Sequence, residues 1–379
     1  MFVSIVIFFA VIFPLLMDNK KKGLIISMCL LFILFGLEYD VVVDWEYNLE
    51  RWNIANNPSE IKNYDVNTDL LYQLILKIFR PITFYGWLMF SAIIELYVIY
   101  KFAVKFVPPR YYWITIFILM MRTYLGFMII NSNRQSIALI LTMCSLLILL
   151  KISDSKPLKS QIKTLVLSVG LLIACFFIHS SAAFAILLIP IFFLLRILEK
   201  LKVKYIVLIF NIIYFSRYFV NSETLYGLIL ESWRTFGSES YIDYIKEMEE
   251  LDFQNSFIEQ FFNWIIITTS AVYFKKMSKA CQLFSICYVA SLFFQTLFGT
   301  NIQRIMIYLS IYVIFMIPNL VMFVNNNVKS SKKLIPYTLY GLMIGFCIMS
   351  YCKYIYWSPS GNFYKWKNYT SIFQAPTWK

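Results

Sequence analysis

Long apolar runs separated by short polar stretches organise this chain. Within each run the apolar residues are continuous and do not alternate with polar ones, which favours membrane-spanning helices over the strands of a membrane barrel. The pattern predicts an all-α integral membrane protein, a polytopic bundle of about 12 transmembrane helices. The predicted helices cover residues 2–17, 24–37, 82–104, 111–130, 135–150, 164–178, 180–195, 205–220, 260–274, 281–298, 302–324 and 335–352.

Two longer connections interrupt the apolar runs. Residues 38–81 and 221–259 are expected to form extracytoplasmic loops. The second loop contains YIDYIKEMEELDFQNSFIEQFF, whose pattern predicts an amphipathic helix at the membrane interface. No repeat, linker or low-complexity segment marks a second domain, so residues 1–379 are expected to form a single polytopic membrane domain.

The composition agrees with a membrane location. The 379 residues are 60% hydrophobic and only 15% charged, which is too apolar for a soluble chain of this length. A net charge of +13 would suggest nucleic acid as a partner of a soluble protein, but here the basic residues fall mainly in short loops. No nucleic-acid partner is therefore expected. The seven cysteines have no metal-type spacing, and we interpret them as small, lipid-compatible residues.

The charges of alternate loops predict the orientation of the chain. Six such loops hold 20 of the 34 Lys and Arg residues but only three of the 21 acids. The positive-inside rule places these loops in the cytoplasm, so both termini are predicted to be extracytoplasmic. The six loops are residues 18–23, 101–110, 151–163, 196–204, 275–280 and 327–334.

Three arginines stand near the predicted outer ends of helices. Arg122 and Arg134 flank the short turn in RTYLGFMIINSNRQSIA, and Arg304 opens a later helix. A guanidinium at membrane depth costs at least about 2.5 kcal/mol, so such a residue is expected to face a wet cavity or an anion. The planar fork of donors on arginine matches phosphate oxygens and suits a pyrophosphate head group. The alternative is that these side chains reach ordinary lipid phosphates at the interface.

Two asparagine–arginine pairs repeat the same spacing. Asn131 and Arg134, like Asn301 and Arg304, are separated by three residues, which places both side chains on one face of a helical turn. Tyr308 follows Arg304 by one further turn. The pairs therefore predict two polar faces at helix ends.

His179 is the only histidine of the chain and lies between two apolar runs in FFIHSSAAF. A single histidine cannot make a metal site by itself, but imidazole suits general acid or base work and hydrogen bonding to a substrate. The alternative is a residue that caps a helix end and is satisfied by Ser180 or a carbonyl.

The acidic run LEYDVVVDWEYNLERW is the second candidate for proton transfer. Asp44 could supply a base for a sugar hydroxyl, or hydrogen-bond sugars while Trp45 and Tyr47 stack on them. The alternative is the solvated start of a loop. The chain has no Walker A motif, Gly-rich dinucleotide turn or serine elbow, so chemistry on soluble nucleotides is not expected.

Several motifs resemble one family of membrane enzymes. NRQSIALIL, followed by FFIHSSAAFAILLIP, resembles the arginine–glutamine and histidine motifs of EpsG-like bacterial polysaccharide polymerases, Wzy-type proteins that make O-antigen, capsule or exopolysaccharide. NIQRIMIYLSIYVIFMIP is similar to the late arginine–tyrosine helix of that family, and FGLEYDVVVDWEYN to its early motif. Glu38 stands where the family usually has arginine and Val42 where it has glycine, whereas Asp44 matches the family's aspartate.

The resemblance implies a reaction at the outer face of the bacterial cytoplasmic (inner) membrane. A growing glycan would pass from undecaprenyl pyrophosphate to a lipid-linked oligosaccharide repeat unit. Arg134 and Arg304 would bind the pyrophosphate with support from Arg122, because charge builds up on that leaving group. His179 or Asp44 would assist deprotonation of the acceptor hydroxyl, and His179 alternatively orients the diphosphate. The other substrate-binding residues expected are Gln135, Asn131, Asn301, Tyr308 and Tyr47.

The same resemblance bears on cofactors and partners. The sugar–pyrophosphate bond already stores the energy, so no cofactor, nucleotide or metal is required. Expected partners are the undecaprenyl-pyrophosphate-linked oligosaccharide and membrane lipid, with a chain-length regulator and a flippase as further candidates.

Two other functions stay open at this point. A flippase or transporter of lipid-linked oligosaccharide should show internal repeats and charge at the membrane centre, for which Glu95 and Arg122 are the only candidates. An O-antigen ligase-type transferase or a membrane acyltransferase would share the arginine and histidine chemistry and differ in the acceptor.

Overall fold

The computed structural model describes the helical core of the chain. All elements within the described residues are helices, and an isolated bridge between Glu38 and Ser371 is the only β-type pairing there. The all-α prediction is therefore confirmed for this part of the chain. The described residues are 2–38, 45–56, 70–121, 133–152, 157–216, 257–298 and 305–327, with single positions 337, 341, 344, 345, 347–349, 351, 352 and 371.

Four helical segments are long and apolar enough to cross a membrane: Phe84–Phe106, Leu158–Ile178, Ser180–Leu198 and Ile307–Asn327. Shorter apolar helices cover Phe2–Leu16, Asn133–Leu149 and Val203–Ser216. These segments make the protein a helical membrane protein. The larger number of twelve spans and the orientation of the termini stay predictions.

The chain divides into two compact units. The first unit comprises Met1–Ile140 and Ile317–Lys379, and the second comprises Leu141–Met316. The single domain predicted from the sequence stays a prediction.

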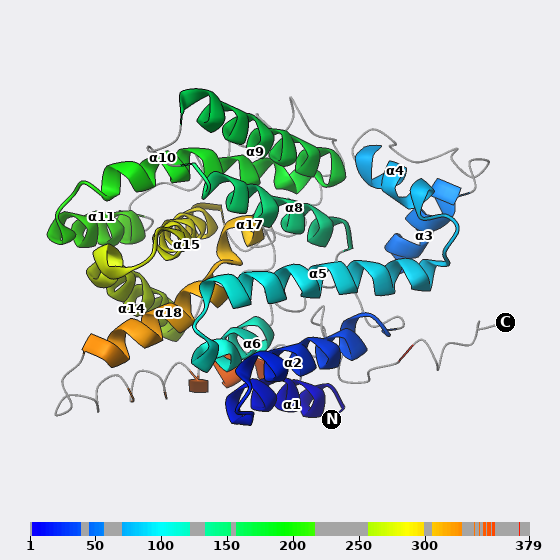
Figure 1. Ribbon diagram of the computed structural model, residues 1–379, viewed down its shortest axis with the longest axis horizontal. Helices are drawn as coiled ribbons and strands as arrows, with labels where there is room; N and C mark the ends of the chain where they lie inside the picture. The colour runs from blue at the N-terminus through cyan, green and yellow to red at the C-terminus, as the bar shows by residue number, and fades with distance from the viewer. Residues whose placement is uncertain are drawn as a thin grey trace. The chain divides into compact units, whose positions relative to one another are not determined.

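The first unit begins with a tight helical hairpin of α1 (Phe2–Leu16) and α2 (Lys20–Phe35), which lie side by side in Figure 1. The Asn19 side chain caps α2 by accepting a hydrogen bond of 3.0 Å from the Lys22 amide. Gly23 permits the close approach, because a Cβ there would lie 2.7 Å from a backbone oxygen of α1. One turn later, the Ser27 hydroxyl donates to the Ala10 carbonyl at 2.5 Å.

The long helix of the first unit is α5 (Phe84–Phe106). Thr83 caps its start by accepting from the Gly86 amide, and Pro108 follows its end. The predicted loop 38–81 contains two helices, α3 (Trp45–Asn56) and α4 (Leu70–Ile78), which pack against each other. A 3-10 turn, η2 (Pro109–Tyr111), then leads from α5 into α6 (Tyr112–Met121).

Helix α8 (Asn133–Leu149) gives its first residues to the first unit and its last to the second. In the second unit, α9 (Leu158–Ile178) packs on α8 through small polar side chains. The buried hydroxyls of Ser145 and Ser168 lie 2.6 Å apart, and Ser145 also bonds the Ser168 carbonyl. Small residues with hydroxyl groups let membrane helices approach closely.

The rest of the second unit surrounds α15 (Lys279–Phe298), which contacts α10, α11, α14 and α17. Its Phe284 ring stacks on Tyr312 with centroids 5.2 Å apart, and Tyr288 donates to the Asn263 side chain at 2.6 Å. The other elements of this unit are η3 (Ser180–Leu187), α10 (Leu188–Leu198), α11 (Val203–Ser216), α14 (Phe257–Tyr273), η4 (Phe274–Lys276) and α17 (Ile307–Ser310). Helix α18 (Val313–Asn327) begins in the second unit and belongs to the first from Ile317 onward. Residues 221–256 of the predicted loop 221–259 lie outside the described residues, and this part contains most of the predicted amphipathic helix.

Candidate functional site

The predicted site residues fall into three groups. Tyr47, Arg134 and Gln135 lie in the first unit, and His179 and Tyr308 lie in the second. The remaining predicted residues lie outside the described residues, namely Asp44, Arg122, Asn131, Asn301 and Arg304. The structure brings Tyr47 together with Arg134, and it links His179 to Tyr308.

Two arginines stack on one tyrosine ring in the first unit. The guanidinium carbon of Arg134 lies 4.7 Å from the centroid of the Tyr47 ring, and that of Arg51 lies 4.5 Å from the same centroid. The two guanidinium carbons are therefore at most 9.2 Å apart, the sum of 4.5 Å and 4.7 Å. An Arg51 amino group also donates to the Tyr47 hydroxyl. We call these three residues the arginine–tyrosine cluster.

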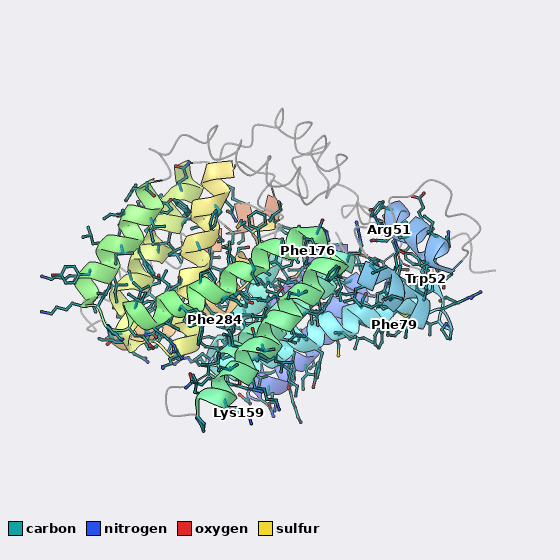
Figure 2. All side chains as sticks on the ribbon, turned by 90° about the horizontal axis from the view of Figure 1, so that it is seen from above. Arg51, Trp52, Phe79, Lys159, Phe176 and Phe284 are labelled. Atoms are coloured by element: carbon teal, nitrogen blue, oxygen red, sulfur yellow. The ribbon has the colours of Figure 1, made fainter. Side chains whose placement is uncertain are left out.

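Helix α3 presents two of the three cluster residues. Tyr47 and Arg51 are four residues apart, so they share one face of α3. Trp45 and Trp52 anchor the helix, because both rings pack on Phe84 at the start of α5. Their ring centroids lie 5.3 and 6.1 Å, respectively, from that of Phe84. Arg51 and Trp52 are labelled on α3 in Figure 2. The tryptophans thereby hold the face that carries Tyr47 and Arg51.

The first turn of α8 supplies Arg134. Its neighbours Asn133, Gln135 and Ser136 are all buried, whereas Arg134 itself is partly exposed. Ser136 is hydrogen-bonded to the carboxyl group of Glu95, a residue of α5 that is only 2% exposed. This contact ties the start of α8 to α5 two residues after Arg134. Arg134 is thus held by α5 as well as by the Tyr47 ring.

A second buried acid, Glu38, lies after α2 and is 3% exposed. Burial raises the pKa of the Glu38 carboxyl well above its ordinary value of 4.5, because desolvation disfavours the charged form. Glu38 lies close enough to Glu95 for the two acids to interact electrostatically. The first unit therefore combines two stacked guanidinium groups with two buried carboxyl groups.

In the second unit, His179 caps a helix. Its Nδ1 accepts a hydrogen bond of 3.2 Å from the Ser181 amide, at the start of η3, and lies 3.0 Å from the Ser181 hydroxyl. The break in the apolar run that contains His179 is therefore real, since α9 ends at Ile178 and η3 begins at Ser180. The capping alternative is confirmed for Nδ1, with Ser181 as the partner in place of Ser180.

Ser181 also contacts Tyr308 of the late arginine–tyrosine motif. The Ser181 hydroxyl lies 3.2 Å from the hydroxyl of Tyr308, and the side chain of Tyr308 is fully buried on α17. Helix α17 packs against η3, which explains why the two residues meet although 127 positions separate them. His179 and Tyr308 are thereby connected through one hydroxyl.

The sequence pattern missed three residues that the structure places at these positions. Arg51 could have been found, because it follows Tyr47 by one helical turn. Ser136 and Ser181 left no comparable signal, since their contacts with Glu95 and Tyr308 depend on how the helices pack. Glu95 was visible in the sequence only as a charge at the membrane centre. Within the described ranges, no group of three or more His, Cys, Asp and Glu side chains is placed to hold a metal ion.

Chemically, the arginine–tyrosine cluster can bind an anion, and the histidine can bind or exchange a proton. Paired guanidinium groups recognise phosphate oxygens, and a tyrosine face preorganises them. No curated protein and no solved structure matches the chain. The EpsG family model, in contrast, matches residues 21–371, a range that contains the arginine–tyrosine cluster as well as His179, Ser181 and Tyr308. The chain therefore belongs to the EpsG family.

Proposed function

We propose that this protein is a polysaccharide polymerase. It transfers a growing glycan from undecaprenyl pyrophosphate to a lipid-linked oligosaccharide repeat unit on the extracytoplasmic face of the membrane. Membership of the EpsG family supports a polysaccharide-polymerase type of function, and the apolar helices support a membrane location. The donor, the acceptor and the side of the membrane are the proposed part.

The observation that carries the proposal is the arginine–tyrosine cluster. When the anomeric bond breaks, the leaving undecaprenyl pyrophosphate takes the electron pair and gains negative charge. Two guanidinium groups no more than 9.2 Å apart can stabilise that charge on one diphosphate, and stacking on Tyr47 limits their movement beforehand. Arg51 thereby joins Arg134 and the predicted Arg304 and Arg122 as a phosphate-binding arginine.

The acceptor hydroxyl must lose a proton as the new glycosidic bond forms. Asp44 or His179 would take this proton, and His179 alternatively orients the diphosphate; Asp44 lies outside the described residues. Gln135, Asn131 and Asn301 complete the proposed substrate contacts, and Tyr308, whose side chain is fully buried, contributes through its hydrogen bond with Ser181. The bond between sugar and pyrophosphate supplies the energy, so the proposed reaction consumes no nucleotide.

The experiment replaces single arginines and follows the glycan. Arg134→Ala and Arg51→Ala, at normal membrane abundance, are expected to leave single repeat units on the lipid carrier and to remove long chains. Removal of one donor to a developing anion costs about 100- to 1000-fold in rate. Arg196→Ala is the matched control, because Arg196 also stacks on an aromatic ring, that of Phe192 at 5.4 Å, on a loop predicted to be cytoplasmic.

The products distinguish the other functions. Repeat units stranded in the cytoplasmic leaflet would indicate a flippase, and long polymer retained on its carrier would indicate a ligase. Persistence of long polymer in both arginine variants would refute the assignment of the cluster.

A further inference from the structure

The hydrogen bonds of His179 determine which of its ring nitrogens carries hydrogen. A backbone amide can only donate, so the amide of Ser181, 3.2 Å away, requires a lone pair on Nδ1. A hydrogen on Nδ1 would point at the amide hydrogen, which disfavours both the Nδ1–H tautomer and the doubly protonated ring. The neutral imidazole of His179 therefore carries its hydrogen on Nε2.

The directions of the hydrogen bonds of the Ser181 hydroxyl follow from the same acceptor role of Nδ1. Because Nδ1 is an acceptor, the hydroxyl 3.0 Å away donates to it. The Ser181 oxygen then accepts from the Tyr308 hydroxyl, 3.2 Å away. Hydrogen bonds thus run in one direction, from Tyr308 through Ser181 to His179, and aligned bonds of this kind strengthen one another.

The surroundings keep this arrangement fixed. Ser181 is 1% exposed and Tyr308 is fully buried, so water does not compete for either hydroxyl. The amide that bonds Nδ1 belongs to the first turn of η3, and the His179 carbonyl accepts from the Ala182 amide at 2.9 Å. His179 itself is partly exposed at the junction of α9 and η3. The ring is therefore oriented by buried partners, and the residue as a whole keeps part of its surface exposed.

We infer that His179 is a hydrogen-bond donor to an oxygen of the lipid-linked substrate, through Nε2–H, and is not the general base. Ser181 and Tyr308 are positioning residues, because they act on the substrate only through the orientation and tautomer of His179. The inference rests on the proposed function and settles between the two roles that the sequence left open for this residue. The proton of the acceptor hydroxyl then passes to another group, for which Asp44 is the candidate.

One test needs no activity. His179 is the only histidine, so histidine labelled with ¹⁵N gives signals from a single ring when the full-length protein carries a purification tag without histidine. The spectrum is recorded in lipid nanodiscs at about pH 8, where an ordinary imidazole, with a pKa of about 6.5, is neutral. Hydrogen on Nε2 and a bare Nδ1 is the expected spectrum. Hydrogen on Nδ1 would overturn the inference whatever the enzyme does.

The labelled protein also tests Ser181. Ser181→Ala keeps the backbone amide but removes the hydroxyl, so the share of the Nδ1–H tautomer is expected to rise. Ser181→Thr, which restores a hydroxyl, should return the ring to the wild-type spectrum. An unchanged spectrum in Ser181→Ala would remove Ser181 from its positioning role.

A second test compares amide replacements during polymerisation. Glutamine places its amide N–H near Nε2, whereas asparagine reaches only the position of Nδ1. His179→Ala and His179→Asn are expected to lose about 100-fold in rate, and His179→Gln to stay within about tenfold of wild type. A general base would make all three variants equally slow, since an amide cannot accept the proton.

The outcomes separate the two proposals. If Arg134→Ala and His179→Ala abolish long chains but His179→Gln is no better than His179→Ala, the polymerase function stands and the donor role fails. If all of these variants keep long polymer, the function itself fails.

Discussion

Tyr47 is the residue on which the proposed diphosphate site depends most, because its ring contacts both arginines of the cluster. A cation–π contact contributes about 0.5–1 kcal/mol when exposed and about 2 kcal/mol when desolvated. Arg51 is buried, at 9% exposed, and Arg134 is partly exposed, so the two contacts together amount to about 2–3 kcal/mol. Since about 1.4 kcal/mol corresponds to a factor of ten, Tyr47→Leu is expected to lower kcat/KM by about 30- to 150-fold.

Tyr47→Phe separates the ring from its hydroxyl. The phenylalanine ring keeps both stacking contacts and loses only the hydrogen bond from Arg51. Water can replace that bond at a partly exposed residue, so the expected loss is about 0.5–1 kcal/mol, or about two- to fivefold in kcat/KM. The assay is the initial rate of polymer formation from a lipid-linked repeat unit by purified protein in nanodiscs.

Tyr97→Leu is the matched control for this series. Tyr97 is 55% exposed on α5 and carries the amino group of Lys101 at 5.1 Å from its ring, so the same substitution removes a comparable contact elsewhere. Its rate is expected to stay within about twofold of wild type. The reasoning fails if Tyr47→Leu is no slower than Tyr97→Leu, or if Tyr47→Phe is as slow as Tyr47→Leu.

Three further predictions concern stability, each measured as the temperature at which detergent-solubilised protein loses its monodisperse form. Gly23→Ala is expected to cost about 1–3 kcal/mol, because the new Cβ would lie 2.7 Å from a backbone oxygen of α1, whereas Gly170→Ala meets nothing within 4 Å and should not lower that temperature. Ser145→Ala and Ser168→Ala should each cost about 0.6 kcal/mol and be non-additive together, since each removes the same buried bond. Glu38→Gln should match wild type below pH 4.5 and become the more stable protein as the pH rises above it. The raised folded-state pKa of Glu38 means that the wild-type carboxyl loses stability as pH rises, and a constant difference across pH would contradict this.

The helices of the membrane core could be predicted because continuous apolar runs leave little choice of structure. The helix predicted at 82–104 is observed as Phe84–Phe106, and the interruption at His179 is observed at that residue. The helices α3 and α4 were not predicted, because α3 mixes tryptophans with polar side chains and has no apolar run. Its anchoring on Phe84 is a tertiary contact, which the local pattern of residues does not specify.

The candidate site could be predicted as residue types but not as contacts. Arg134 and Tyr47 were both expected to bind substrate, yet their stacking joins residues 87 positions apart on different helices. From the sequence alone, Ser180 or a carbonyl is the expected partner of a capping His179, and the extended backbone of His179, at φ −153° and ψ 118°, brings Ser181 into that place. One backbone conformation therefore decides which nitrogen of the ring caps η3.

The buried carboxyl group of Glu95 in α5 helps to position Arg134, although its burial costs free energy. A carboxyl group inside a membrane-spanning helix costs about 2.5–3.5 kcal/mol on insertion scales, so a helix retains one only where it has a partner and a use. The partner is Ser136, in the first turn of α8, and one of the two Glu95 oxygens still makes no hydrogen bond. Ser136 follows Arg134 by two residues, so its contact with Glu95 fixes the position of the first turn of α8 along α5. The Tyr47 ring fixes the guanidinium group itself. Two independent contacts thus define the position of Arg134. The proposed recognition of a diphosphate requires such a fixed position, which a flexible side chain at a lipid interface would lack.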